Sequence, residues 1–184
     1  MTQSPLSPPP GLALREIERA DIARINAWRN DPEVISGLFA GFRYITEEVD
    51  QAWFDAYLRS RDSNIRLAIL NGGRHIGNVQ LTGIHPVNRS AEFSIFIGDK
   101  DQRGQGAGNW ATRRMILHGF TELNLNRIFL TVLEDNRPAI RVYEKAGFRT
   151  EGLQRQAVFK DGRYQNAIMM SLLAAEIDPA ALNA

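Results

Sequence analysis

The chain has 184 residues, of which 43% are hydrophobic and 23% charged, the proportions of a globular domain that buries its own core. Its 22 basic and 21 acidic residues give a net charge of +1, which argues against nucleic-acid or anionic-membrane partners. Cysteine is absent and there are only three histidines, which argues against disulfides, thiolate zinc sites and cysteine nucleophiles. We therefore expect a cytoplasmic protein that needs no metal.

The two ends of the chain differ in composition from its middle. Residues 1–11 are rich in Pro and Ser and have neither the basic nor the apolar region of a signal peptide, so we expect a disordered leader. Residues 12–175 are expected to form a single domain, and residues 176–184 a C-terminal tail.

The first part of this domain is predicted to contain an edge strand from Leu12 to Ile17 and then two helices. Asp21 is in position to cap the first helix, which ends at Asp31-Pro32. The second helix, over residues 46–60, starts with Thr46 as its N-cap. Its apolar face is predicted to carry Val49, Ala52, Trp53, Ala56 and Tyr57.

The rest of the domain alternates between strand and helix periodicity. Asp161-Gly162 is a strong signal for a type I′ turn in a terminal hairpin. We expect strands at residues 65–70, 74–81, 91–98, 127–133, 154–160 and 163–173, and helices at 109–123 and 136–147. This order predicts an α/β fold with a central mixed sheet flanked by helices and a C-terminal antiparallel hairpin.

A glycine-rich segment between Asp101 and Trp110 is the first candidate site. Glycines let a backbone approach a ligand closely, and the start of the following helix offers free N–H groups to an anion such as pyrophosphate. The alternative is a loop selected for tight packing. No Lys-Ser/Thr pair follows, which excludes a P-loop, and Asn109 stands where a Rossmann fingerprint needs Gly or Ala.

Two motifs carry a resemblance to a known family. Arg103-x-x-Gly106-x-Gly108 resembles the pyrophosphate signature of the GNAT superfamily of N-acetyltransferases. The later segment Asn136-x-x-Ala139-x-x-x-Tyr143-x-x-x-Gly147-Phe148 resembles its second motif. Residues 28–33 and 161–164 resemble the branch of ribosomal-protein, polyamine and nucleotide-aminosugar acetyltransferases. The resemblance covers nearly all of residues 12–173.

The resemblance implies the GNAT fold, in which acetyl-CoA, the co-substrate, lies in a V between two splayed strands, here residues 91–98 and 127–133. Asn136 is expected to bind the pantetheine amides, to cap its own helix, or to do both. The cofactor-binding residues implied are Ile95, Phe96 and Ile97 for the pantetheine arm, then Arg103, Gly104, Gln105, Gly106, Ala107, Gly108 and Asn109 for the pyrophosphate, with Asn136 and Ala139.

Acetyl transfer to an amine needs a base for the amine and benefits from an acid for the departing thiolate. The resemblance assigns the acid to Tyr143, whose alternative role is packing on its helix face. Glu92, in an otherwise apolar strand, is the candidate base, and an apolar setting would raise the pKa of its carboxyl group. The alternative is a surface residue paired with Arg89 or another cation.

We therefore expect an N-acetyltransferase that transfers the acetyl group directly to a primary amine of a small molecule of polyamine or aminosugar type. Acids in residues 31–55 form either an attractive rim for a cationic acceptor or a solvated helix face. The alternatives are a protein N-terminal acetyltransferase of ribosomal-protein type and a catalytically silent acyl-CoA-binding module. The sequence leaves homodimer formation open.

Overall fold

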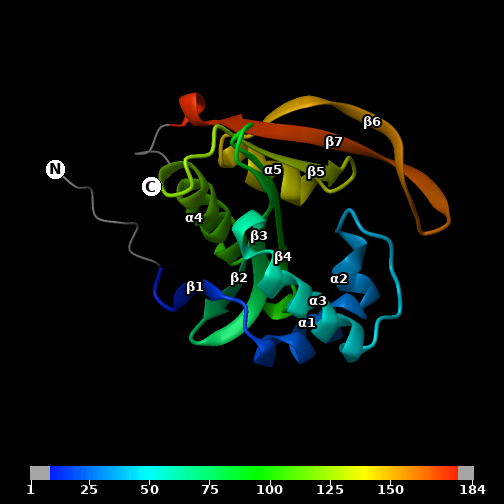
Figure 1. Cartoon of the computed structure of the whole chain (residues 1–184). Coiled ribbons are helices and arrows are strands. Elements are labelled where there is room, and N and C mark those ends of the chain that lie inside the picture. Colours follow the sequence, from blue (N-terminus) through cyan, green and yellow to red (C-terminus); the bar gives the residue numbers. More distant parts are fainter. Residues whose placement is uncertain (1–8, 178–184) are drawn as a thin grey trace.

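The computed structural model describes residues 9–177, and a single seven-stranded sheet runs through it in the order β1-β2-β3-β4-β5-β7-β6 (Figure 1). Neighbouring strands are antiparallel except β4 and β5, which are parallel, so the predicted mixed sheet is confirmed. The strands are β1 (Leu12–Glu16), β2 (Asn64–Asn71), β3 (Arg74–His85), β4 (Ser90–Ile97), β5 (Arg127–Leu133), β6 (Arg149–Lys160) and β7 (Arg163–Leu173).

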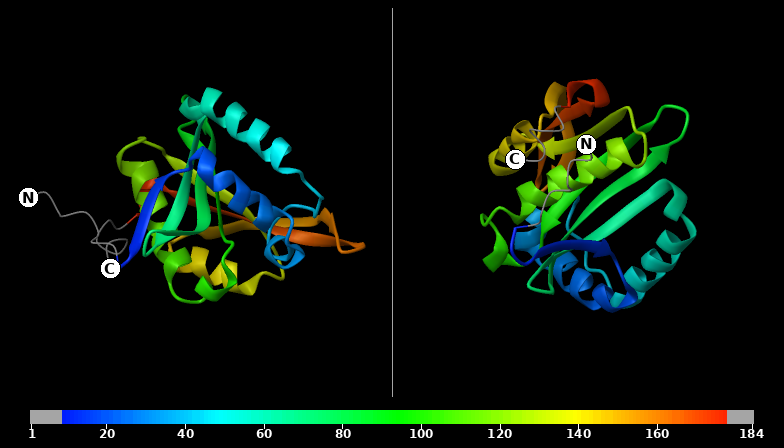
Figure 2. Two further views of the ribbon diagram at one scale, coloured as in Figure 1. Left: turned by 90° about the horizontal axis from the view of Figure 1, so that it is seen from below. Right: turned by 90° about the vertical axis from the view of Figure 1, so that its left-hand side faces the viewer.

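Helices cover both faces of this sheet (Figure 2). They are α1 (Ile22–Arg29), α2 (Pro32–Ser36), α3 (Glu47–Arg59), α4 (Ala107–Thr121) and α5 (Arg137–Lys145). Successive strand residues point to opposite faces, so Ala68 packs with the cluster under α1 and α3 while Ile69 packs with the larger cluster under α4 and α5. Among residues 9–177, no helix is long and apolar enough to cross a membrane.

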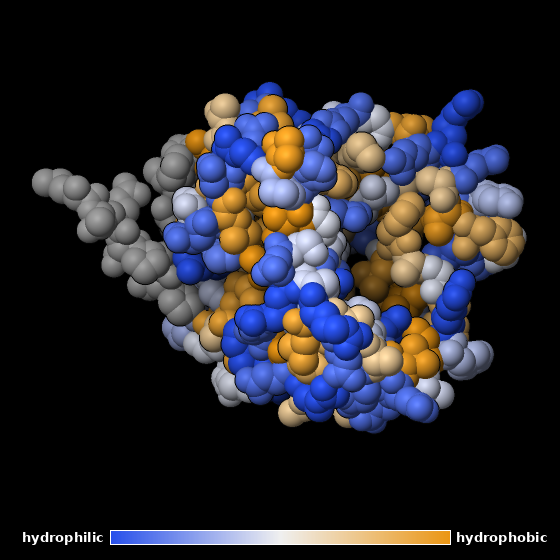
Figure 3. All heavy atoms as spheres, viewed as in Figure 1, coloured by the Kyte–Doolittle hydropathy of each residue, from blue (hydrophilic) through white to orange (hydrophobic). Residues whose placement is uncertain are grey.

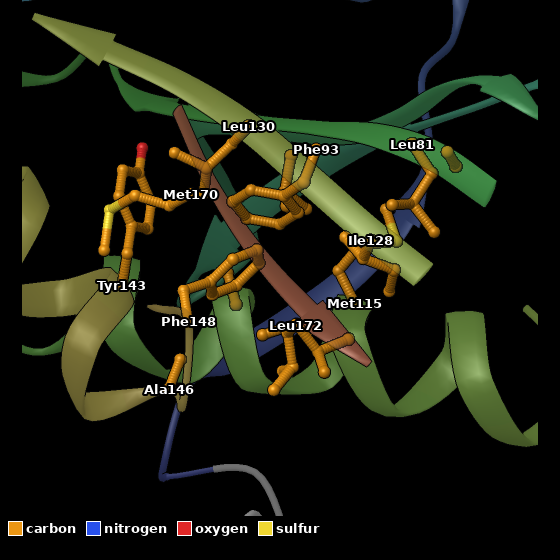
Figure 4. Packing of buried hydrophobic residues seen from close by; sticks show 14 of the residues in the cluster. Leu81, Phe93, Met115, Ile128, Leu130, Tyr143, Ala146, Phe148, Met170 and Leu172 are labelled. Atoms are coloured by element: carbon orange, nitrogen blue, oxygen red, sulfur yellow. The ribbon is translucent and has the colours of Figure 1, made fainter. Parts of the chain in front are cut away.

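The larger core cluster connects the second predicted motif to the centre of the sheet (Figure 4). The ring of Tyr143 meets those of Phe93 and Phe148 in T-shaped contacts, with centroids 6.0 and 5.9 Å apart. Phe93 comes from β4 and Phe148 follows the end of α5, which is the packing predicted for a residue after a C-terminal glycine. These contacts fix α5 against the strand that borders the candidate site.

The sheet is split in its middle, as predicted. β4 pairs with β5 at only three positions, where Ser90, Ala91 and Glu92 lie opposite Arg127, Ile128 and Phe129. β4 continues to pair with β3 on its other side as far as Ile97. The N–H and C=O groups that β4 directs toward β5 beyond Glu92 therefore have no partner strand.

The ends of the domain differ from the prediction. Pro9 and Gly11 are held by the fold, since the Leu12 N–H donates to the Pro9 carbonyl (2.9 Å) and the Gly72 N–H to the Gly11 carbonyl (2.8 Å). The rest of the predicted leader, residues 1–8, lies outside the described residues. At the other end, Glu176 forms an ion pair with Arg149 (2.8 Å), and residues 178–184 of the predicted tail lie outside the described residues.

The helix starts also differ in detail. Asp21 does not cap α1; its carboxylate accepts from Arg15 (2.7 and 2.8 Å) and from the Glu18 N–H (2.8 Å). Asp31 does more than end α1, because it caps the short helix α2 by accepting from the Glu33 N–H (2.9 Å), with Pro32 in the first turn. Thr46 stands at the N-cap of α3 but its side chain forms no capping bond.

The buried face of α3 agrees only in part with the prediction, because Tyr57 and the half-buried Trp53 pack inward but the other three predicted residues do not. Asp50, Phe54 and Tyr57 are buried, whereas Val49 is 54% exposed and Ala52 and Ala56 are also exposed. The face is rotated because Asp50 is fully buried, although carboxylates usually lie on the surface. Its carboxylate accepts hydrogen bonds from Arg29 and from Asn26 (2.8 Å). A paired charge therefore decides the orientation of this helix.

Two strands are longer than predicted. β3 continues from Leu81 to His85, and β6 begins at Arg149, with register irregularities between Thr150 and Gly152 and between Gln154 and Val158. The predicted turn is confirmed: Asp161 and Gly162 both have positive φ, 52° and 75°, as a type I′ turn requires.

Candidate active site

The glycine-rich segment ends in the N-terminus of α4, as predicted. Gly106 is the N-cap residue with φ 89°, a left-handed conformation that favours glycine. The first intrahelical bond runs from the Trp110 N–H to the Gly106 carbonyl (3.0 Å), so the N–H groups of Ala107, Gly108 and Asn109 have no partner within the helix. A Cβ added at Gly106 would meet no atom within 4 Å, so the space beside the start of this helix is open.

A cavity of about 810 Å³ lies in front of these donors and between them and α5. Arg103 lines it but is also tied to the fold, since its Nε donates to the Ile97 carbonyl (3.1 Å) and its guanidinium lies 3.7 Å from Glu33. Arg141 and Lys145 of α5 line the same cavity and were missed by sequence reasoning, although their i, i+4 spacing places both on one helix face. Backbone donors and cations together fit a diphosphate.

A second cavity, of about 410 Å³, lies in the V between β4 and β5. Both cavities are lined by Ile95, Phe96, Asn136 and Ala139, so they are neighbours along β4, while Ile97 lines the larger one. The segment after α2 also borders both. We call Gly37–Ala40 the wall segment; all four residues line the smaller cavity. Figure 3 shows the surface hollowed right of centre, with apolar side chains gathered on the right-hand side of the hollow.

Asn136 is a capping residue. Its Oδ1 accepts from the Ala139 N–H (3.2 Å), which confirms the predicted helix cap. Its Nδ2 donates to the Gly37 carbonyl (2.8 Å) and so connects α5 to the wall segment. A contact between Asn136 and a pantetheine amide stays a prediction.

Tyr143 both packs in the core and borders the smaller cavity, as its two predicted roles require. Its ring is buried in the core, while its hydroxyl oxygen points out of that cluster (Figure 4) and the residue lines the smaller cavity. Burial raises the pKa of the Tyr143 phenol to about 12. The phenol is therefore fully protonated near neutral pH, in the form of a proton donor.

Glu92, on β4, lines the same cavity as Tyr143, which lies on α5. The prediction of an apolar setting for Glu92 is wrong, because its side chain is exposed where β4 still pairs with Thr82 of β3 and Phe129 of β5. The alternative pairing with Arg89 is also wrong, because Arg89 donates to the carbonyl (2.7 Å) and Oδ1 (2.9 Å) of Asn124. The carboxylate is open to solvent and to whatever enters the cavity.

A row of uncharged polar side chains forms another part of this cavity. Asn78, Gln80 and Thr82 of β3 lie opposite Phe96, Ser94 and Glu92 of β4, and all six line it. The Nε2 of Gln80 donates to the Ser94 hydroxyl (2.6 Å). Sequence reasoning missed this row, although polar residues alternate with Val79 and Leu81 along β3 and so mark one polar face of a central strand.

Half-buried Arg66 and buried His75 orient the amides of this row. Arg66 donates to Gln80 and lies 5.0 Å over the Trp53 ring, while His75 Nε2 lies 2.6 Å from Asn78 Oδ1. His75 itself is only 6% exposed, and burial lowers the pKa of its imidazole. These partners fix which polar atoms of Asn78 and Gln80 face inward.

The acids of residues 31–55 do not form a rim on the smaller cavity. Asp31 and Glu33 pair with Lys100 (3.0 and 2.6 Å), and Asp50 and Asp55 pair with arginines, so four of the six acids are neutralised. Glu92 is the one carboxylate among residues 9–177 that lines this cavity. In the same part of the chain, no group of three or more His, Asp or Glu side chains could hold a metal ion.

A parallel strand pair that opens beside a helix N-terminus provides a binding place for an extended thioester with a diphosphate at one end, and this defines the class of acyl-CoA-dependent transferases. Residues 12–149 match the family model described as "Acetyltransferase (GNAT) domain", and the chain belongs to this family. It is an acetyl-CoA-dependent N-acetyltransferase.

Three relatives illustrate its place in the family. The chain is 33% identical over 165 residues to spermidine N(1)-acetyltransferase of Escherichia coli strain K12, covering 86% of this chain and 84% of the relative. It is 32% identical over 114 residues to a putative ribosomal N-acetyltransferase of Bacillus subtilis, covering 62% of each. The solved structure of spermidine N-acetyltransferase from Vibrio cholerae in complex with CoA and spermine superposes with a TM-score of 0.85 at 30% identity, covering 90% of this chain and 97% of that one.

Proposed function

We propose that the protein acetylates a primary amine of a small molecule of polyamine type, by direct transfer in a ternary complex with acetyl-CoA. The observation that carries this proposal is that the Tyr143 and Glu92 side chains line one cavity, which continues along β4 into the cavity in front of α4. The relatives named as spermidine acetyltransferases, which match 86–90% of this chain, support the acceptor class.

The chain's own groups supply three parts of the reaction. Glu92 takes a proton from the acceptor ammonium, directly or through a water molecule, and leaves a neutral amine to attack the thioester carbonyl. The backbone N–H groups of β4 without a partner strand stabilise the oxyanion that forms. As the carbon–sulfur bond breaks, Tyr143 donates a hydrogen bond to the thiolate, the attacking nitrogen releases its second proton to solvent, and the amide product keeps the acetyl group.

The larger cavity is the proposed site for the diphosphate end of acetyl-CoA. Residues 103–109 supply backbone donors and the Arg103 guanidinium, and Arg141 and Lys145 add positive charge from α5. The pantetheine arm is placed beside residues 95–97, whose backbone faces the open side of the sheet. No step requires a metal in this scheme.

A specific observation favours an aminosugar as the second candidate acceptor. The row formed by Asn78, Gln80, Thr82 and Ser94 is uncharged, and Glu92 is the one acid in the cavity among the described residues. The hydroxyl groups of a sugar would form hydrogen bonds with these uncharged side chains, whereas the ammonium groups of a polyamine would find no ionic partner among them. A protein N-terminus has weaker support, since the ribosomal-type relative matches only 62% of this chain.

The experiment follows CoA release with a thiol-reactive dye while acceptors are varied among spermidine, glucosamine and an N-terminal peptide. Because the chain has no cysteine, the dye detects CoA thiol alone. We expect the highest kcat/KM with spermidine and intersecting initial-rate patterns for a ternary complex. Release with none of the amines, despite CoA binding in a calorimeter, would identify a silent binding module. Size-exclusion chromatography of the same sample tests the homodimer.

A further inference from the structure

Lys160 is a buried cation that the reaction scheme does not use. It lies at the end of β6, beside the type I′ turn, and is only 5% exposed. Its Nζ donates to three main-chain carbonyls, those of Ile35 (2.5 Å), Leu38 (2.8 Å) and Ala40 (3.2 Å). No carboxylate among residues 9–177 forms an ion pair with it; three neutral carbonyls from one segment of chain surround the ammonium group.

All three carbonyls belong to the wall segment or to the end of α2 directly before it. The remaining anchor of this wall is Asn136, which donates to the Gly37 carbonyl and caps α5, the helix that carries Tyr143. The wall segment has no regular secondary structure, so side chains must satisfy the carbonyls that a helix or strand would have satisfied. Lys160, from β6, and Asn136, at the start of α5, therefore both anchor this part of the chain.

We propose that Lys160 is a positioning residue that holds the wall segment in place and thereby sets the affinity of the acceptor cavity for the amine. The proposal rests on the acceptor role assigned above to the smaller cavity. All four residues of the wall segment line that cavity, while only Gly37 and Leu38 also border the larger one. Loss of the anchor therefore acts on the acceptor more than on acetyl-CoA.

An ammonium group suits this position because it has three N–H donors, one for each carbonyl, whereas a neutral side chain of the same length has none. Burial lowers the pKa of Lys160, but the group still contributes as a cation when the carbonyls solvate it in place of water. A neutral replacement would leave the Leu38 and Ala40 carbonyls without the donor they have now, while the Ile35 carbonyl would keep only the Leu38 N–H (2.9 Å) and the Gly37 N–H.

The first test compares Lys160→Met with Arg155→Met. The control removes the same charge from the same strand, at an exposed side chain for which no contact with the wall segment is present. We expect Lys160→Met to raise the KM for the amine at least about tenfold, which corresponds to about 1.4 kcal/mol, with the KM for acetyl-CoA changed less than about twofold. The control should behave like the wild type.

The second test restores the ammonium chemically. Since the chain has no cysteine, Lys160→Cys introduces a single thiol, which is alkylated in urea with 2-bromoethylamine or, as the neutral match in length, with 1-iodopropane before refolding. The aminoethyl form should regain the wild-type KM for the amine and the propyl form should not. Equal recovery by both forms, or a wild-type KM in Lys160→Met, would overturn the proposal.

Hydrogen exchange separates this proposal from the proposed function. Wild-type protein that acetylates no amine contradicts the acceptor assignment and with it the effect on KM. Even then, amides of residues 37–40 should exchange faster in the propyl form than in the aminoethyl form. Equal exchange in the two forms would show that Lys160 does not hold the wall segment.

Discussion

Replacing Tyr143 with Phe removes one hydroxyl group and leaves the ring contacts with Phe93 and Phe148 in place. Burial alone accounts for the raised pKa of this phenol, and its hydroxyl donates to no other residue among 9–177. The variant therefore loses no hydrogen bond within the protein, and we expect the free energy of unfolding to change by less than about 1 kcal/mol. Only the reaction should be affected.

The size of the kinetic effect follows from the pKa. A positioned proton donor contributes roughly 10²–10⁴ in rate. A phenol with a pKa of about 12 is a weaker acid than an ordinary thiol, whose pKa is about 8.5, so complete proton transfer to the thiolate is uphill. Tyr143 then stabilises the leaving thiolate through a hydrogen bond, and we expect the low end of the range. The kcat should fall about 100-fold, or about 2.7 kcal/mol in the barrier.

The assay measures kcat by CoA release, acetyl-CoA affinity by calorimetry and stability by urea unfolding. Tyr57→Phe is the matched control, because burial and Glu16 also raise the pKa of Tyr57 to about 12, but its hydroxyl donates to Glu16 (2.5 Å) in the other core cluster. The control should lose about 1–3 kcal/mol of stability and keep its kcat. A kcat within about threefold of wild type in Tyr143→Phe would leave Tyr143 with a packing role only.

Three further predictions concern the cofactor loop, the base and alkaline stability. In Gly108→Ala the new methyl would meet only Ile97, at 3.8 Å, so Tm should hold or rise while acetyl-CoA affinity in a calorimeter falls about tenfold; unchanged affinity would remove this loop from the binding site. Glu92→Gln should lower kcat/KM at neutral pH and recover part of it as pH rises and the amine deprotonates unaided; a wild-type pH profile would make Glu92 a surface strand residue. The pKa of Tyr57 and of Tyr143 is about 12 in the folded protein and near 10 in the unfolded chain, so the unfolded chain loses these protons first as the pH rises. The free energy of unfolding should therefore fall between pH 10 and 12, by up to about 2–3 kcal/mol for each tyrosine. Urea titrations in which Tyr143→Phe shows the full wild-type fall would contradict this.

The predictable parts of the fold are those controlled by nearby residues. Gly106 has the left-handed φ required at the start of α4, and Asp161-Gly162 form a type I′ turn. Asn136 caps α5 by accepting from the N–H group three residues later in the chain. Each depends on a few neighbouring positions, so the pattern is visible in a single sequence. Tyr143 is singled out by the resemblance of its motif to that of the family, and it lies on the helix that Asn136 caps and lines the smaller cavity.

The parts that could not be predicted depend on contacts between distant segments. Asp50 is buried because Arg29 and Asn26 come from another helix, and its burial rotates α3 away from the face that hydrophobicity indicates. Lys160 meets the wall segment across more than a hundred residues of chain, and no local pattern shows that the Leu38 and Ala40 carbonyls accept from a distant side chain.

The limited pairing of β4 with β5 also has a mechanical consequence. The sheet consists of a four-stranded half, β1 to β4, and a three-stranded half, β5 to β7, connected across the seam at three residue positions. In the proposed complex, an extended ligand lying along the open part of the seam would complete the missing row of backbone hydrogen bonds, in the manner of an added strand. Bound acetyl-CoA would thus stabilise the contact between the two halves of the sheet, and the force needed to pull these halves apart should rise with the concentration of acetyl-CoA.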